Sequence, residues 1–281
     1  MTELRRRMKE DLQLAGFTER TQKSYVDAVR GLAKYYRRSP DLLTEEEVRQ
    51  FFLHLINERK SAKSTVTIYL SGIKFFYETT LKQKWNIFGL VRPVPTKRLP
   101  VVLSREEVHA LLKMIKNPIA RMALTIIYAC GLRLSEGARL RVKDIDSDRK
   151  LLWVRDGKGR KDRSVPLPER PLELLRAHYK MYGQKSEWLF PNKDGHINIC
   201  TIQTVFRKVV RESGINKQAT VHTLRHSYAT HLLECGEDIS TLKEILGHGS
   251  IVTTNIYTHL TEKITDRLDR SLNDLMNDLA P

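Results

Sequence analysis

Residues 221–226 place an imidazole and a guanidinium three positions apart. In Val-His-Thr-Leu-Arg-His, His222 and Arg225 share one face if the segment is helical. An imidazole can accept a proton near neutral pH, and a guanidinium can hold an anion through two parallel hydrogen bonds. The pair could therefore act on an anionic substrate, although the same spacing is common on a solvent-facing helix.

Two further segments carry candidate reactive groups. Tyr257 offers a phenol, which becomes a nucleophile toward phosphorus when a base and positive charge favour its ionisation. Arg133 follows Gly131 among apolar neighbours, and Glu136 three positions later can orient its guanidinium. Each residue also has a structural explanation, because most tyrosines only pack and a buried arginine needs an anionic partner.

A calcium site is not expected at the aspartates of residues 144–148. Asp144, Asp146 and Asp148 start like an EF-hand loop, but Arg149 stands where the loop needs glycine and Arg155 where it needs glutamate. The segment is therefore not a calcium loop.

Zinc and nucleotide motifs are also incomplete. His222 and His226 have the spacing of a helical zinc pair, but Thr223 stands where metalloproteases carry glutamate. The glycines around Lys158 lack the spacing of a phosphate-binding loop. We expect no metal, no ATP and no other cofactor.

The charge balance indicates a polyanionic partner. The chain has 281 residues, with 49 Lys and Arg against 33 Asp and Glu, a formal net charge of +16. Residues 1–100 carry 20 basic and 11 acidic residues, and residues 101–260 carry 26 and 17. Two basic segments suggest that both contact nucleic acid, with a solvated basic surface as an equal alternative. Only residues 261–281 reverse the sign, with three basic and five acidic residues.

Membrane and secreted classes are not indicated. The longest apolar stretch, residues 122–132, is shorter than the roughly 20 residues that span a bilayer, and residues 1–7 do not resemble a signal peptide. Cys130, Cys200 and Cys235 are odd in number and far apart, which argues against a disulfide framework. We expect a cytoplasmic protein with core thiols and no membrane partner.

The first ninety residues predict four short helices. The first ends at Gly16, Thr18 caps the second, and Thr44 and Glu47 form a capping box for the third. The fourth covers about residues 61–81. The inward stripe predicted for the third helix consists of Val48, Phe51, Phe52, Leu55 and Ile56. Residues that could face a phosphate backbone here are Lys60, Lys63, Ser64 and Thr65.

A basic linker is predicted at residues 91–103, because three prolines there cannot continue a helix. Its Arg92, Lys97 and Arg98 could contact DNA while the flanking modules sit on opposite sides, as in a clamp.

Beyond the linker, residues 104–281 predict a second domain. Ser104 and Glu107 form another capping box, and a helix covers about residues 119–128. Residues 151–154 and 164–167 read as a small antiparallel sheet joined by a glycine turn, and the rest is mostly helical, ending in an amphipathic helix at 262–280. The expected fold is mainly α with a small antiparallel β-sheet, in two domains.

Taken together and in order, these segments resemble the tyrosine recombinase, or phage-integrase, family, and especially its short Xer-like site-specific recombinases. The matching blocks are Gly-Leu-Arg-Leu-Ser-Glu at 131–136, Gly-Lys-Gly-Arg-Lys-Asp-Arg at 157–163, His-Thr-Leu-Arg at 222–225, Leu-Gly-His at 246–248 and Thr-Thr-Asn-Ile-Tyr-Thr-His at 253–259. The resemblance implies a helical, SAM-like core-binding domain at 1–90 and an α+β catalytic domain at 104–281.

The resemblance also implies the chemistry. Tyr257 would attack the scissile phosphorus and form a 3′-phosphotyrosyl link. A second 5′ hydroxyl would then attack this link and reverse the step, and strand exchange would pass through a Holliday junction. The other implied roles are phosphate ligands for Arg133 and Arg225, proton acceptor for His222, hydrogen-bond donor for His248, leaving-group acid for Lys158, orienting residue for Glu136, and phosphate contacts for Arg160, Lys161 and Arg163.

The implied partners are double-stranded recombination sites and three further copies of the chain, with a second recombinase possible, in the cytoplasm and associated with the nucleoid. Two alternatives are a type IB topoisomerase-like activity and a non-catalytic DNA-binding regulator.

Overall fold

The computed structural model describes residues 2–91, 99–155, 162–183, 186–193 and 195–247, and it divides into two compact units, Met1–Arg98 and Leu99–Pro281. The division falls within the predicted linker. Residues 92–98 lie outside the described part, so the proposed DNA contacts of Arg92, Lys97 and Arg98 stay predictions. Each unit has its own buried core.

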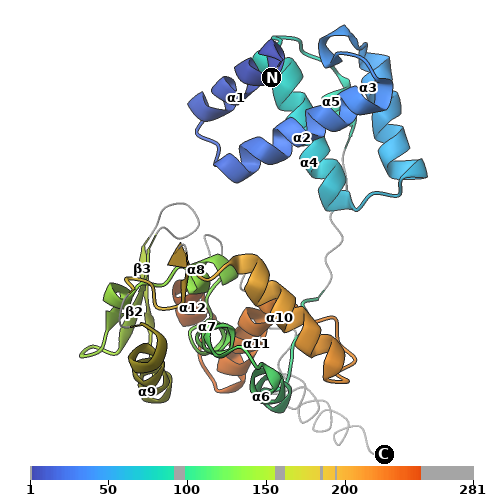
Figure 1. Ribbon diagram of the computed structural model, residues 1–281. Helices are drawn as coiled ribbons and strands as arrows, with labels where there is room; N and C mark the ends of the chain where they lie inside the picture. The colour runs from blue at the N-terminus through green and yellow to red at the C-terminus, as the bar shows by residue number, and fades with distance from the viewer. Residues whose placement is uncertain (1, 92–98, 156–161, 184–185, 194, 248–281) are drawn as a thin grey trace, which may run out of the picture. The chain divides into compact units, whose positions relative to one another are not determined.

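The described part of the first unit consists of helices and loops (Figure 1). The α-helices are α1 (Glu3–Leu14), α2 (Glu19–Tyr36), α3 (Glu45–Leu53), α4 (Lys63–Phe75) and the short α5 (Ile87–Leu90). A 3₁₀ turn, η1 (Pro40–Leu42), precedes α3, and the π-helical turns η2 (His54–Glu58) and η3 (Phe76–Thr80) extend α3 and α4.

Helices α2 and α3 begin at the capping residues predicted from the sequence. The Thr18 hydroxyl accepts a hydrogen bond from the Thr21 amide, and Thr44 and Glu47 form a reciprocal capping box. Ile56 was predicted to point inward but is 48% exposed. It lies in the wider π-helical turn η2, which rotates it away from the buried face of α3.

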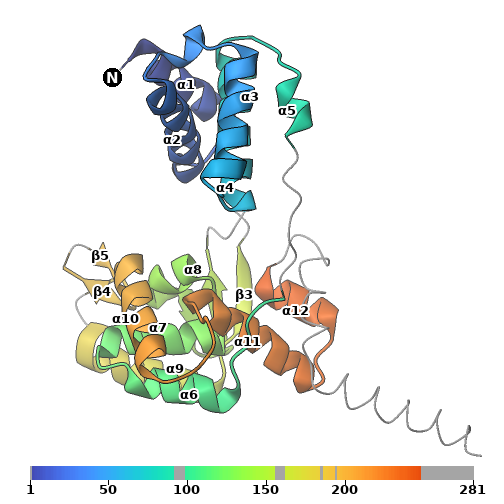
Figure 2. The ribbon, with the colours of Figure 1, turned by 90° about the vertical axis from the view of Figure 1, so that its right-hand side faces the viewer.

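The four main helices of the first unit pack around one core (Figure 2). Residues buried in it include Leu12 of α1, Leu32 of α2, Phe52 of α3 and Ile73 of α4. Every helix predicted for this unit therefore contributes to the core.

The second unit combines helices with a small sheet (Figure 1), as predicted. Its helices are α6 (Arg105–Met114), α7 (Pro118–Ala129), α8 (Leu134–Ala138), α9 (Glu169–His178), α10 (Ile199–Glu212), α11 (Val221–Glu234) and α12 (Ile239–Leu246), with the 3₁₀ turn η4 (Val142–Asp144) and the π-helical turn η5 (Tyr179–Gly183). Its strands are β1 (Ile145–Asp146), β2 (Leu151–Val154), β3 (Arg163–Pro166), β4 (Pro191–Asn192) and β5 (Gly195–His196).

The larger sheet has the antiparallel order β1-β2-β3. Leu152 pairs with Val165 and Val154 with Arg163. Because Leu152, Val154 and Val165 are buried, the alternation of a strand places Arg163 on the inner face as well. Strands β1, β4 and β5, of two residues each, were not predicted from the sequence; β1 pairs with β2, and β4 pairs with β5.

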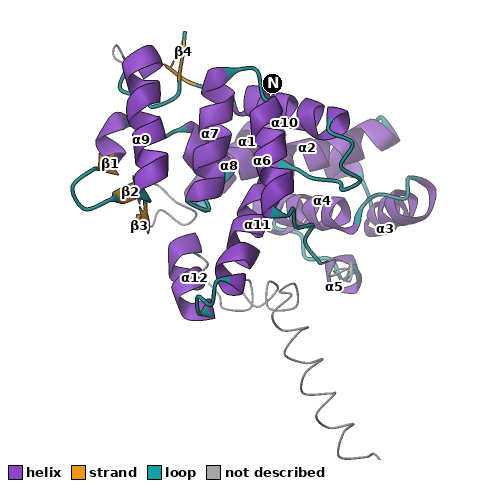
Figure 3. Cartoon of the chain, turned by 90° about the horizontal axis from the view of Figure 1, so that it is seen from below, coloured by secondary structure: helices purple, strands orange, loops and turns teal. Residues whose placement is uncertain are grey.

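Helix α7 runs through the middle of the second unit, in contact with α6, α8, α9, α10 and α11 (Figure 3). It begins at Pro118 after an Asn117 cap, and its Ala123, Leu124, Ile126 and Ile127 are fully buried. The helix ends at a turn in which Gly131 has a φ of 59°. This turn delivers Arg133 to the start of α8.

The prediction of three core thiols holds only for Cys130. Cys200 is exposed next to the Asn198 cap of α10, and Cys235 is exposed at the end of α11. Both lie at helix ends, where the chain leaves the core. Within the described residues, no helix is long and apolar enough to cross a membrane.

Candidate active site

Arg133 is held at the start of α8 by Glu136. The Arg133 amide donates to Glu136 Oε2 at 2.8 Å, and its Nη1 donates to Glu136 Oε1 at 2.7 Å. The backbone bond caps the helix, and the side-chain bond fixes the direction of the guanidinium. The pairing expected from the three-residue spacing is therefore present.

Glu136 is the buried centre of a cationic cluster. Its side chain is 6% exposed, and it accepts two hydrogen bonds from Arg163, at 3.0 and 2.8 Å. Arg225 Nη1 lies 4.0 Å from Glu136 Oε2. Burial alone would raise the pKa of Glu136, but the hydrogen bonds and charge of Arg163, followed by the bonds from Arg133, lower it to about 2. The residue is a carboxylate at every physiological pH.

Arg225 reaches the same place from α11. It is 1% exposed, and its Nη1 and Nη2 donate to the carbonyl oxygens of Gly131 and Leu246, both at 2.6 Å. The bonds join the turn after α7 to the end of α12. They also aim a buried guanidinium at the region occupied by Arg133 and Glu136.

The C-terminal end of α12 is capped by three guanidiniums. Arg163 Nε donates to the Ile245 carbonyl at 2.9 Å, Arg225 donates to the Leu246 carbonyl, and Arg133 Nη2 donates to the Gly247 carbonyl at 3.2 Å. The last carbonyls of a helix lack partners within it and carry partial negative charge, so cations stabilise them. Successive carbonyls are thus held by cations from three different elements.

His222 lies on the first turn of α11 and is exposed, one turn before Arg225. Partial desolvation of the ring, followed by the positive charges of Arg225 and Arg133, lowers the pKa of His222 below its usual value. The ring is therefore neutral near pH 7 and can accept a proton. The His226 ring lies 4.6 Å away, between centroids. In the described part of the chain, no group of three or more His, Cys, Asp and Glu could hold a metal ion.

Beyond the linker, five more predicted site residues lie outside the described residues: Lys158, Arg160, Lys161, His248 and Tyr257. Two described residues adjoin them in the chain. Gly247, which accepts from Arg133, directly precedes His248, and Arg163 closes the turn segment that contains Lys158. The structure thus brings together Arg133, Glu136, His222 and Arg225, while the placement of the remaining residues stays a prediction.

Arg163 was predicted as a phosphate contact, but its guanidinium is engaged inside the protein. Its side chain is 11% exposed and donates to Glu136 and to the Ile245 carbonyl. These contacts hold Arg163 within the protein, and its predicted contact with phosphate stays a prediction. The sequence contained a signal that the Arg163 side chain points inward, because strand alternation puts it on the same face as the apolar Val165.

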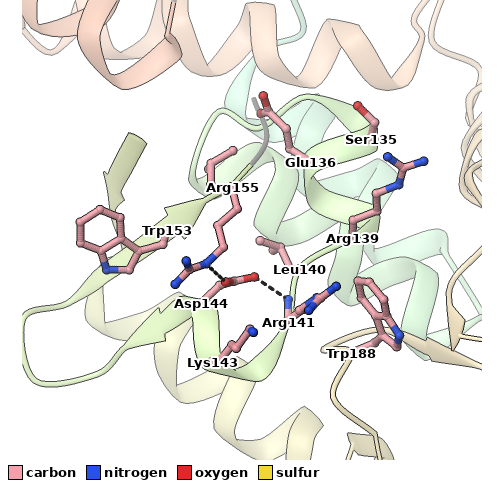
Figure 4. Close-up of a pocket in the computed structure, with 11 residues that line it drawn as sticks. Ser135, Glu136, Arg139, Leu140, Arg141, Lys143, Asp144, Trp153, Arg155 and Trp188 are labelled. Carbon is pink, nitrogen blue, oxygen red and sulfur yellow. Dashed lines mark hydrogen bonds and ion pairs between the residues drawn. The ribbon is translucent and has the colours of Figure 1, made fainter. Parts of the chain in front are cut away.

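A cavity of about 240 Å³ lies beside Glu136 (Figure 4). Asp144 on its wall accepts from Arg155 Nε at 2.8 Å and from the Arg141 amide at 2.9 Å. The Arg141 guanidinium stacks over the Trp188 ring, 4.6 Å from its centroid. The exposed Arg139 and Lys143 complete a basic wall that sequence reasoning missed.

The DNA-contact residues predicted in the first unit lie together at the start of α4. Lys60, Lys63 and Ser64 are exposed, and Thr65 is partly exposed. Lys60 adopts a φ of 48° in the loop after η2, and the Thr65 amide donates to the Ala62 carbonyl at 2.8 Å. No side chain caps α4, so the N-terminal end of this helix, with its partial positive charge, is not covered by a capping side chain.

Comparison with known families and proteins agrees with this geometry. The Phage integrase family model matches residues 101–263, and the model of the phage integrase N-terminal SAM-like domain matches residues 4–87. A putative integrase/recombinase, y4qK of Sinorhizobium fredii, is 40% identical over 94% of this chain and 87% of its own length. The tyrosine recombinase XerA of Thermococcus kodakarensis is 33% identical over 89% of this chain and 88% of its own.

A solved structure extends the comparison to the fold. Residues 75–356 of lambda integrase, crystallised as a dimer bound to a COC′ core site, match with a TM-score of 0.75 and 18% identity over 92% of this chain and 94% of that one. The comparisons do not favour the topoisomerase-like or regulatory alternatives. The chain belongs to the phage integrase family of tyrosine recombinases, and it is a Xer-like enzyme of site-specific DNA recombination.

Proposed function

We propose that the enzyme cleaves and rejoins DNA strands through a covalent link between Tyr257 and the 3′ phosphate. The observation that carries the proposal is the convergence of Arg133 and Arg225 on one buried carboxylate, Glu136, although Arg133 precedes α8 and Arg225 lies in α11. Two guanidiniums held in this way can bind the two non-bridging oxygens of a phosphodiester. Charge on these oxygens grows in the transition state, so the interaction lowers the barrier.

In the proposed step, the Tyr257 oxygen bonds to phosphorus and the bond from phosphorus to the 5′ oxygen breaks. His222 takes the phenolic proton, which fits the lowered pKa of its neutral ring. Lys158 gives a proton to the departing 5′ oxygen, and His248 donates a hydrogen bond to the phosphate. Because a phosphotyrosyl ester replaces a phosphodiester, a second 5′ hydroxyl can reverse the step with no ATP and no cofactor.

Recombination by this route exchanges one pair of strands at a time, through a Holliday junction. We propose that four copies of the chain, or copies together with a partner recombinase, assemble on two double-stranded sites in the nucleoid. The apolar stripe and acidic character of residues 262–280 suit a helix that is passed to a neighbouring copy. That segment lies outside the described residues.

The proposed DNA contacts lie in the first unit, in the linker and in the second unit. Lys60, Lys63, Ser64 and Thr65 belong to the first unit, and their exposure beside the start of α4 supports this role. Arg92, Lys97 and Arg98 of the linker and Arg160 and Lys161 of the glycine turn are proposed from the sequence alone. In the second unit, Arg139 and Lys143 add exposed cations beside Glu136. Such contacts would position the protein on DNA without selecting its sequence.

The test is covalent capture on a suicide substrate, a DNA duplex nicked so that cleavage cannot be reversed. We expect wild-type protein to form a covalent protein–DNA complex and Tyr257→Phe to form none. Tyr182→Phe is the matched control, because Tyr182 is an exposed tyrosine of η5 outside the cationic cluster. An unchanged covalent yield in Tyr257→Phe would refute the assignment of the nucleophile.

A further inference from the structure

Arg163 is a nearly buried guanidinium for which the proposed reaction has no direct use. Its three donor nitrogens are all engaged: Nη1 and Nη2 grip the two oxygens of Glu136, and Nε donates to the Ile245 carbonyl. A two-point grip of this kind fixes the plane of the carboxylate as well as its distance. The side chain therefore holds Glu136 in one orientation.

The contacts of Arg163 link Glu136, and through it Arg133, to the end of α12. Because Glu136 is held in one orientation, it also orients Arg133, which donates two hydrogen bonds to it, of 2.8 and 2.7 Å. At its other edge Arg163 anchors α12, whose C-terminal residue precedes Gly247 and the segment of His248 and Tyr257. One side chain of β3 thus links the phosphate-binding arginine to the helix that leads into the proposed nucleophile.

The packing around Arg163 is close. Its side chain lies against Gly247 after α12, where an added Cβ would be 2.9 Å from Arg163 Cδ. Gly247 also has a φ of 62°, which favours glycine. A shorter or differently shaped side chain at position 163 would leave both Glu136 and the α12 end without this support.

We propose that Arg163 is a positioning residue for strand cleavage, which acts by orienting Glu136 and through it Arg133, and by fastening the end of α12 to β3. The proposal rests on the role of Arg133 as a phosphate ligand given above.

Loss of Arg163 has a specific electrostatic consequence. Glu136 would remain buried, with Arg133 of α8 and the more distant Arg225 of α11 as its remaining charged neighbours among the described residues. In the wild-type protein, Arg163 makes the largest contribution to lowering the pKa of Glu136. Without Arg163, burial of the carboxylate therefore raises this pKa. Once Glu136 takes up a proton, its grip on Arg133 weakens, so cleavage loses rate as the pH falls.

The experiment measures single-turnover cleavage of a suicide substrate at saturating DNA, from pH 5 to 9, with full-length protein. We expect Arg163→Met to lower the cleavage rate at pH 7.5 by about 10- to 100-fold, the usual scale for a misplaced catalytic group, with DNA affinity changed by less than about threefold. On the acid side of the profile the rate of Arg163→Met should fall more steeply than that of wild type, beyond the loss that protonation of His222 causes in both proteins. Arg163→Lys keeps the charge and should recover part of the rate.

Arg170→Met is the matched control, since Arg170 pairs with Glu173 on α9 but its side chain is 79% exposed. It should behave as wild type. If Arg163→Met does not fold, as judged by circular dichroism, the decision passes to Arg163→Lys. Wild-type cleavage rates with a weakened DNA affinity in the folded variant would overturn the proposal in favour of a phosphate contact. So would a pH profile parallel to that of wild type. Failure of the wild-type protein itself to form the covalent complex would instead refute the proposed function.

Discussion

Gly131 is the residue on which the approach of Arg133 and Arg225 to one another depends. It has a positive φ of 59°, its carbonyl accepts from Arg225, and Arg133 follows two residues later. A Cβ at this position would lie 2.4 Å from Tyr228 Cδ1 and 3.1 Å from Leu246 Cδ2. The turn therefore requires glycine for two reasons, the backbone conformation and the space.

We expect Gly131→Ala to lower the free energy of unfolding by about 2 to 4 kcal/mol, the sum of left-handed strain and overpacking. Gly214→Ala is the control, because Gly214 has a φ of 73° but nothing within 4 Å of an added Cβ. It should cost about 1 kcal/mol, from backbone strain alone. Urea unfolding at pH 7 measures both, and equal losses would show that the contact with Tyr228 does not matter.

Glu136 should also give stability a dependence on acid pH. Its pKa is about 2 in the folded protein and near 4.5 in the unfolded chain, so folding favours the carboxylate. The contribution is complete above the unfolded value and is lost as the pH falls from about 4.5 through 2. Glu136→Gln removes this contribution, so its stability should fall less steeply than that of wild type across this window in thermal melts. Parallel slopes for the two proteins would contradict the assignment.

At the scale of elements, the cap of α7 controls the helix that leads into the site. The Ala120 amide donates to Asn117 Oδ1 at 2.9 Å, and Pro118 occupies the first turn. We expect Asn117→Ala to lower the free energy of unfolding by about 1 kcal/mol, as for other N-caps. Asn216→Ala, at an exposed position where the described structure shows no cap, should have little effect in the same urea titration. Equal losses in the two variants would rule out the capping contribution.

The elements that the sequence predicted are those with strong local signals. Both capping boxes, at Thr44 and Ser104, are confirmed, and so is the β2–β3 pair. The paired strands β1, β4 and β5 have two residues each, too few for a pattern of alternation. Ile56 was misplaced because a π-helical turn changes the helical period, a feature that local sequence does not signal.

In the candidate site, too, the contacts between residues close in sequence were predicted, and those between distant residues were not. The contact between Arg133 and Glu136 follows from their spacing, and His222 and Arg225 lie one turn apart on α11 as predicted. The meeting of Arg225 with Gly131 joins residues 94 positions apart, so only the resemblance suggested it. The role of Arg163 depends on a β-strand, a helix end and a buried carboxylate that meet only in the folded unit.

At the scale of the molecule, positive charge is divided between two units that each have a core. The first 98 residues carry 20 basic and 11 acidic residues, and residues 99–281 carry 29 and 22. Separate cores are typical of parts that fold by themselves. A DNA-binding enzyme of this kind could use either unit alone for affinity, or both together as the clamp that the basic linker suggests.

Salt dependence distinguishes these two cases. Each phosphate neutralised steepens the fall of log K with log salt by about 0.9, so contacts made by two units add in the slope. We expect fragments 1–98 and 99–281, once shown to be folded by circular dichroism, each to bind a DNA duplex at low salt, and the intact chain to show a slope steeper than either. Fluorescence anisotropy from 50 to 300 mM NaCl measures this. An intact chain with the slope of one fragment would mean that only that unit contacts the phosphates, because an unused unit adds positive charge without releasing counterions from DNA.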